Sequence, residues 1–152
     1  MVGEFIGASA THRKLTRTET DMTFDRVFTQ APWETEIGHC RAVRAGDHIF
    51  VTGTAPLDDD GGVYAVGDAY GQAKRCLEII SRSLAQLGAS MADVVRTRMF
   101  VTDITRWAEF GRAHREVFAN HPPATSMIEV KSLIGPAMLI EIEADAVRPT
   151  AH

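Results

Sequence analysis

The feature that most constrains the fold is a run of strict alternation near the C-terminal end, LIEIEADAV at 139–147. It predicts a β-strand with Ile140, Ile142, Ala144 and Ala146 on one face and Glu141, Glu143 and Asp145 on the other. Neighbouring carboxylates on the second face would lie only about 7 Å apart. Because burying an unpaired carboxylate is costly, this face must meet water, cations or another subunit. We therefore expect the chemistry of the protein at this strand.

Three earlier segments also have strand patterns, at 40–44, 48–53 and 94–101. The first two are joined by Ala-Gly-Asp at 45–47, which suits a tight hairpin turn. In the third we expect Val95, Thr97, Met99 and Val101 on one face and Arg96, Arg98 and Phe100 on the other. A further strand-like run follows Pro-Pro at 122–123.

Two segments have the three- and four-residue spacing of amphipathic helices. The first, 69–87, follows Asp68 as a cap and precedes Gly88. The second begins at Thr105, the expected N-cap, ends at 119, and places along one side Trp107, Phe110, His114, Val117 and Phe118. With about six strands, these helices predict an α+β domain in which both cover one face of a mixed or largely antiparallel sheet.

The length of 152 residues favours one domain, in which a large cleft would need a second subunit. We expect a single domain at 31–152, preceded by an N-terminal extension at 1–30 that is rich in threonine and charge. The net charge of −4 argues against nucleic-acid binding, which usually needs a concentrated basic surface.

Two cysteines, Cys40 and Cys76, form no CxxC pair, so a reducing, cytoplasmic setting is expected. Cys76 lies on the apolar stripe of the first helix and is expected to be a buried structural thiol. The start of the chain lacks the apolar core of a secretory signal, and no window is long enough to span a membrane. The six histidines lack metal-binding spacing, and we expect no cofactor and no membrane partner.

Five segments together carry a resemblance to a known family. They are GDHIFVTGTAPL at 46–57, GDAYGQAKRCLEII at 67–80, LGASMADVVRTRMFVTDI at 87–104, FGRAHREVFANHPPA at 110–124 and EIEADAV at 141–147. Over roughly 37–148 the chain resembles the RidA/YjgF family of enamine and imine deaminases. The resemblance implies a chorismate-mutase-like fold and a homotrimer whose sheets surround a central barrel, with a ligand cleft between each pair of neighbouring subunits.

The resemblance also implies where the site lies. In the family's deaminases a glutamate on the last strand positions the attacking water, and Glu141 occupies that position here. An arginine after Pro-Ala clamps the substrate carboxylate in those enzymes, but Thr125 stands there in this chain. A threonine supplies one neutral hydroxyl in place of a charged, bidentate fork. The chain thus resembles a divergent subgroup that lacks the carboxylate-binding arginine.

Two further departures lie in the implied cleft. The Tyr-Ser-Gln run of the deaminases appears as His39-Cys40-Arg41, and Gly111 replaces a polar residue on the second helix. With Glu141 as the catalytic residue, we expect a substrate-binding set of Thr125, Ser126, Thr52, Gly53, Arg41 and His39.

Three arginines could compensate for the missing clamp: Arg41, Arg96 or Arg98. The alternative for the last two is that they form cross-strand ion pairs with the acidic residues of 139–147. A Cys–His nucleophilic site is disfavoured, because His39 and Cys40 would point to opposite faces of a strand.

We expect a hydrolase or deaminase that acts on a small imine, enamine or related metabolite, with a substrate range altered by Thr125. The alternative is a metabolite-binding or regulatory trimer that kept the cleft and lost catalysis. The endoribonuclease activity attached to the family's name is disfavoured by the acidic charge balance.

Overall fold

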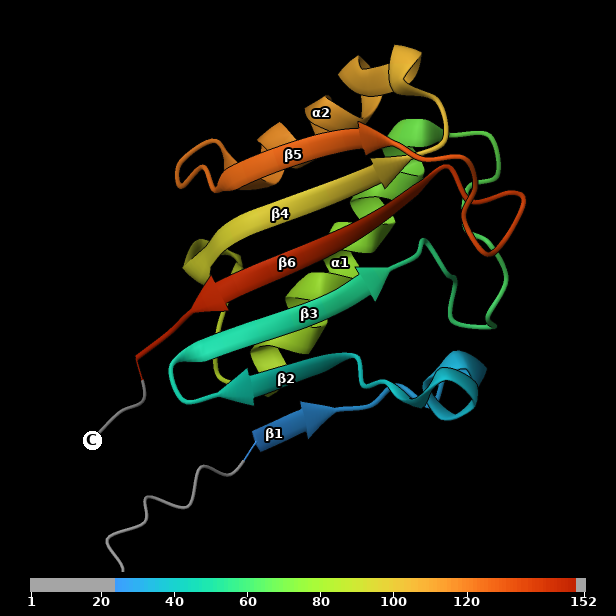
Figure 1. Cartoon of the computed structure of the whole chain (residues 1–152). Helices are drawn as coiled ribbons and strands as arrows, with labels where there is room; N and C mark the ends of the chain where they lie inside the picture. Colours follow the sequence, from blue (N-terminus) through green and yellow to red (C-terminus); the bar gives the residue numbers. More distant parts are fainter. Residues whose placement is uncertain (1–23, 150–152) are drawn as a thin grey trace, which may run out of the picture.

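The computed structural model describes residues 24–149. A single sheet is covered on one face by the α-helices (Figure 1). The sheet has the order β1-β2-β3-β6-β4-β5. The strands are β1 (Phe24–Val27), β2 (Ala42–Ala45), β3 (His48–Thr54), β4 (Val94–Val101), β5 (Ala124–Glu129) and β6 (Ile140–Val147), and the helices are α1 (Ala69–Gln86) and α2 (Trp107–Phe118). Short turns of helix lie at Glu34–Gly38, Met91–Asp93 and Ile104–Arg106.

The last strand, β6, lies inside the sheet and is antiparallel to both of its neighbours, β3 and β4. Strands β4 and β5 are parallel, so the sheet is mixed, as predicted. The α2 helix connects these two parallel strands across one face. The register places Glu141 opposite Phe100 and Glu143 opposite Arg98.

The alternation of β6 is confirmed, because Ile140, Ile142, Ala144 and Ala146 are all buried, while the three acidic residues are only partly so. The buried residues pack against α1, which runs behind β3 and β6 (Figure 1). Cys76 is fully buried in α1, as expected for a structural thiol. Asp68 caps that helix by accepting a hydrogen bond from the backbone of Gly71.

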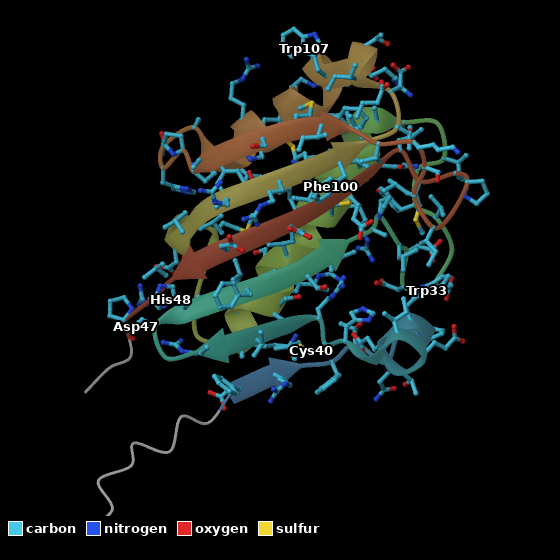
Figure 2. All side chains as sticks on the ribbon, viewed as in Figure 1. Trp33, Cys40, Asp47, His48, Phe100 and Trp107 are labelled. Carbon is cyan, nitrogen blue, oxygen red and sulfur yellow. The ribbon has the colours of Figure 1, made fainter. Side chains whose placement is uncertain are left out.

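The opposite face of the sheet has no helix in the described part of the chain. This open face carries Val43, Phe50, Phe100, Arg98, Ile128, Glu141, Glu143 and Asp145. Phe50 is 46% exposed and Ile128 is 48% exposed. Figure 2 shows Phe100 standing on the face turned toward the viewer. The open face is therefore a surface on which large apolar side chains alternate with charges.

The first half of β4 differs from the predicted strand. A β-bulge between Val94 and Arg96 shifts the register, so Val94 is buried and Val95 is 48% exposed. The bulge inserts one residue and reverses the side on which the following side chain points. From Thr97 onward, the predicted buried set of Thr97, Met99 and Val101 is confirmed.

The start of α2 also differs from its prediction. Asp103, rather than Thr105, caps the turn at Ile104–Arg106 by accepting a hydrogen bond from the backbone of Thr105. The α-helix proper begins at Trp107, whose side chain is 61% exposed in its first turn. Phe110 and Phe118 are buried as expected, so the inner side of the helix begins one turn later.

Strand β1 lies within the segment that we expected to precede the domain. It pairs with β2, and its last residue, Val27, is buried in the core. Strand β2 begins at Ala42 instead of Cys40. Residues 1–23 of the predicted extension lie outside the described residues. In the described range, neither helix has the length and apolar character that crossing a membrane requires.

Candidate functional site

The candidate site is organised around the carboxylate of Glu141, which packs directly against Gly53 of β3. A Cβ atom at Gly53 would overlap the Oε1 atom of Glu141 and would lie 2.9 Å from its Cδ atom. The pairing of β3 with β6 shifts register between Val51 and Thr54, which places Gly53 in an irregular part of the strand. Any larger residue at position 53 would therefore displace the carboxylate.

The surroundings of Glu141 shift its pKa away from that of an ordinary glutamate. Burial raises the pKa of Glu141, the positive charge of Arg41 acts in the opposite direction, and the negative charge of Glu143 raises it further. His39 also lowers it to a smaller extent. The net effect is a raised pKa, which is the property that a carboxylate needs to exchange protons near neutral pH.

Hydrogen bonds hold Arg41 beside this carboxylate. Its Nη2 atom donates a 3.0 Å hydrogen bond to the carbonyl oxygen of Gly53, and the backbone N–H of Thr52 donates to the Arg41 carbonyl oxygen at 3.1 Å. Burial lowers the pKa of Arg41, while the carboxylates of Glu34 and Glu141 act in the opposite direction. Arg41 therefore already interacts with two negative charges.

Glu34 completes the charged group from the short helical turn before β2. Its carboxylate accepts hydrogen bonds from the backbone and hydroxyl of Thr29 and from the backbone of Gln30, at 2.8 to 3.1 Å. Burial alone would raise the pKa of Glu34, but these hydrogen bonds and the charge of Arg41 lower it overall. Glu34 is therefore a fixed anion, in contrast to Glu141.

Two polar atoms near Glu141 are buried and have no partner among the described residues. They are Nε of Arg41 and Nδ1 of His39. A buried donor without a partner costs free energy unless water or a ligand satisfies it. Both atoms are therefore available for a hydrogen bond to water or to a ligand.

A groove of about 670 Å³ opens beside this cluster on the side of β2 and β3. It is lined by Thr52, His39, Cys40, Glu34, Phe50 and Glu143, among others. Figure 2 shows Cys40 between the helical turn and β2. Glu141 is not among the lining residues, so the groove adjoins the carboxylate without enclosing it.

Thr125 lies elsewhere, on the edge strand β5. It is paired with Thr97 of β4, and the two hydroxyl oxygens lie 2.9 Å apart. Because Thr97 is fully buried on the helix side, Thr125 faces that side as well. Ser126, its neighbour, pairs with Arg98 and shares the open face with it. Of the predicted substrate-binding set, only Arg41, Gly53, His39 and Thr52 gather near Glu141.

The separation of Thr125 from Glu141 follows from the register. Thr125 is level with Ala144, which is three residues along β6 from Glu141, and β4 lies between the two strands. These offsets correspond to about 14 Å between backbone positions, with the side chains on opposite faces. A small molecule cannot contact both side chains within one subunit.

Arg98 is engaged in cross-strand ion pairs. Its Nη1 atom lies 3.4 Å from Oε2 of Glu143 and 3.3 Å from Oδ2 of Asp145. These contacts are the cross-strand ion pairs that we considered as the alternative role of Arg98. The exposed Arg96 pairs with Asp145 in the backbone register.

The sequence pattern missed one polar connection. Oγ1 of Thr97 lies 2.9 Å from Nε2 of His114 on α2, and burial lowers the pKa of His114. The predicted faces put both residues toward the core, and a threonine and a histidine facing one another in a core are a usable indication of a hydrogen bond. Within residues 24–149, no group of three or more His, Cys, Asp or Glu residues could hold a metal ion.

Comparisons with known proteins give consistent matches. The sequence model of the family described as endoribonuclease L-PSP matches residues 29–148, which include Gly53 and Glu141. An uncharacterized protein of Streptomyces coelicolor is 34% identical over 123 residues, 81% of this chain and 91% of that protein. The 3-aminoacrylate deaminase RutC of Acinetobacter baylyi is 33% identical over 105 residues, 69% of this chain and 82% of the enzyme. A solved structure from Mycobacterium tuberculosis, described as a member of the YjgF/YER057c/UK114 family, has a TM-score of 0.75 and 42% identity, covering 82% of this chain and 99% of that one.

Proposed function

This chain belongs to the RidA/YjgF (endoribonuclease L-PSP) family and has its chorismate-mutase-like fold, and from that membership we propose that it hydrolyses a small imine, enamine or related metabolite. Membership of the RidA/YjgF family and the mixed sheet with helices on one face are confirmed. One relative is named as a deaminase of 3-aminoacrylate, which is an enamine. The similarity to that enzyme supports deamination as the class of reaction.

The observation that carries the proposal is the half-buried carboxylate of Glu141, held against Gly53 with a raised pKa. A carboxylate with a raised pKa accepts a proton from water more readily than an ordinary glutamate does, and it can return that proton later in the reaction. It stands at the position where the family's deaminases have their water-positioning glutamate. Glu143 and Asp145 differ in this respect, because both pair with Arg98.

The proposed reaction needs only water and one proton carrier. Glu141 accepts a proton from a water molecule as the water oxygen bonds to the carbon of the protonated imine, and the C=N π electrons pass to nitrogen. The resulting carbinolamine then receives a proton on nitrogen, the C–N bond breaks, and ammonia leaves with the bonding electron pair. The hydroxyl proton is lost, which gives a carbonyl product. An enamine substrate first takes a proton on carbon, which gives the protonated imine directly.

We assign Arg41 a positioning role in this reaction. Its hydrogen bond to the Gly53 carbonyl holds the irregular part of β3, and its charge opposes the burial effect on Glu141. Because its charge already interacts with Glu34 and Glu141, Arg41 is poorly placed to clamp a substrate carboxylate as well. We therefore propose that Arg41 does not take over the role of the clamp.

We propose that the complete site forms between subunits of a homotrimer whose open faces enclose a central barrel. Two features of the chain support this assembly. Thr125 and Glu141 cannot meet one small molecule within a subunit, as their register shows. The open face exposes Phe50 and Ile128, which a second copy of the face could cover.

The proposal is tested by ammonia release from freshly generated 3-aminoacrylate and 2-imino acids, with Glu141→Ala and Thr125→Arg beside the wild-type protein. Turnover that Glu141→Ala abolishes supports the hydrolase, and a gain on 2-imino acids in Thr125→Arg identifies position 125 as the clamp. If no variant releases ammonia but small metabolites raise the melting temperature, the protein is the metabolite-binding trimer instead. Light scattering checks the assembly, because a monomer would remove the intersubunit cleft.

A further inference from the structure

A chain of three polar side chains runs from the edge of the sheet into the core. Thr125 Oγ1 lies 2.9 Å from Thr97 Oγ1, which lies 2.9 Å from Nε2 of His114. Thr97 is fully buried, whereas Thr125 is exposed on β5, the edge strand. His114 is held on α2 beside Phe118, with ring centroids 4.5 Å apart. The chain therefore links a surface hydroxyl to a fixed imidazole.

The hydroxyl proton of Thr125 takes part in a hydrogen bond whichever way the Thr125–Thr97–His114 chain is oriented. A neutral imidazole donates or accepts at Nε2, so the chain has two orientations. When His114 donates to Thr97, Thr97 donates to Thr125, and Thr125 donates to the Pro123 carbonyl oxygen 3.2 Å away. When His114 accepts from Thr97, Thr125 donates to Thr97. In both orientations the proton of Thr125 is already in a hydrogen bond, so a ligand donor meets a free lone pair, whereas a ligand acceptor must first displace an existing bond.

This arrangement has the opposite polarity to an arginine. A guanidinium only donates hydrogen bonds, which suits a carboxylate that only accepts them. A carboxylate at the same place would accept the proton of Thr125 only by breaking the hydrogen bond that Thr125 makes to Thr97 or to the Pro123 carbonyl oxygen. A ligand group with an N–H or O–H, by contrast, completes the hydrogen bond. Position 125 therefore differs from the clamp in direction as well as in charge.

We propose that the Thr125–Thr97–His114 chain makes the cleft select a substrate that carries an uncharged hydrogen-bond donor, such as a primary amide or a hydroxyl, in place of a carboxylate. This inference rests on the proposed function, because it takes Thr125 as part of the ligand cleft. The inference specifies the substrate class, which the absence of the arginine by itself does not specify. Thr97 and His114 act through Thr125 and are specificity-determining positioning residues.

Two keto compounds of nearly equal shape test the selection without turnover. They are 2-oxobutanamide and 2-oxobutanoate, which resemble the products of neutral and anionic imines. We expect calorimetry to show that the wild-type oligomer binds the amide about tenfold more tightly than the acid, the value of one hydrogen bond of ordinary net strength. In Thr125→Val this preference should disappear, and in Thr125→Arg it should reverse.

The role of the buried hydroxyl is tested by two variants at position 97. Thr97→Val keeps the shape but removes the hydroxyl, so the preference should fall, whereas Thr97→Ser keeps the hydroxyl and should retain it. A variant that acted only through packing would change both probes equally. His121→Phe is the control for His114→Phe, because both rings pack on Phe118 and only His114 belongs to the chain.

Each outcome decides the inference. It is overturned if the wild-type protein binds the acid as tightly as the amide, if it binds neither probe, or if Thr97→Ser behaves like Thr97→Val. The proposed hydrolysis has a separate readout, which is ammonia release. An amide preference without ammonia release would reject hydrolysis and leave the selection intact, and ammonia release with an acid preference would do the reverse.

Discussion

The carboxylate of Glu141 occupies the space where a side chain of Gly53 would be. This relationship joins β6 to the irregular part of β3 and explains why a glycine stands there. It also removes the carboxylate from water, which raises the pKa of Glu141. The geometry of the site and its proton chemistry therefore depend on the same contact.

Adding one methyl group at position 53 should disable the site. Gly53→Ala pushes the Glu141 carboxylate away, and a misplacement of about 1 Å costs on the order of a hundredfold in rate. Ammonia release measures the loss. A rate for Gly53→Ala equal to that of the wild-type protein would contradict the proposed role of Gly53.

Removing the charge of Arg41 should shift the pH dependence of turnover. Arg41 lowers the pKa of Glu141 against the effect of burial, so Arg41→Gln lets that pKa rise further. A general base works only above its pKa, and the acid limb of the rate profile should therefore move to higher pH. Arg98→Gln removes a cation that pairs with Glu143 and Asp145 and should leave the limb in place. If the acid limb of the rate profile stays in place in both variants, the proposed effect of Arg41 on Glu141 is wrong.

His114 should make the fold less stable in weak acid. Burial lowers its pKa, so the stability associated with the neutral ring is complete above the unfolded-state value of about 6.5 and is lost as the pH falls toward the folded-state pKa. Thermal unfolding between pH 7.5 and pH 5 measures this loss. The loss should be smaller in His114→Phe and unchanged in His48→Gln, which alters an exposed ring. A steeper loss in His114→Phe would contradict the direction of the pKa shift.

A cation on the open face should break the proposed trimer. Phe50→Lys places an ammonium group opposite Asp145, where the subunit can pair it, but it removes apolar surface from the face. Light scattering should then report monomers with unchanged circular dichroism. Trp107→Lys is the control, because Trp107 is also exposed but lies at the start of α2 (Figure 2). A trimer that survives Phe50→Lys would place the contact elsewhere.

The sheet and its helices could be predicted because the spacing of apolar residues in each strand or helix depends on that element alone. The alternation of β6 and the apolar stripe of α1 follow from side-chain direction within a single element. The bulge at Val94 could not be predicted in this way, because a bulge depends on how β4 pairs with β6. The same holds for β1, whose Val27 is buried only by its place in the sheet.

The residues of the candidate site were predictable by position but not by arrangement. The resemblance named Glu141 and Gly53, yet their contact depends on an irregular pairing that no local pattern specifies. The same resemblance grouped Thr125 with Glu141, although the parallel register of β4 and β5 separates them. That register also creates the link from Thr125 through Thr97 to His114, which depends on three distant segments.

The measurement that tests the central claim most directly is ammonia release from 3-aminoacrylate by Glu141→Gln and Glu143→Gln. Both changes replace one carboxylate of the same strand face by an amide of the same shape, but only Glu141 packs on Gly53. We predict that Glu141→Gln loses at least about a hundredfold in rate, the usual contribution of a general base, while Glu143→Gln stays within a few-fold of the wild-type protein. Equal activity of the two variants, or a greater loss in Glu143→Gln, would contradict this account.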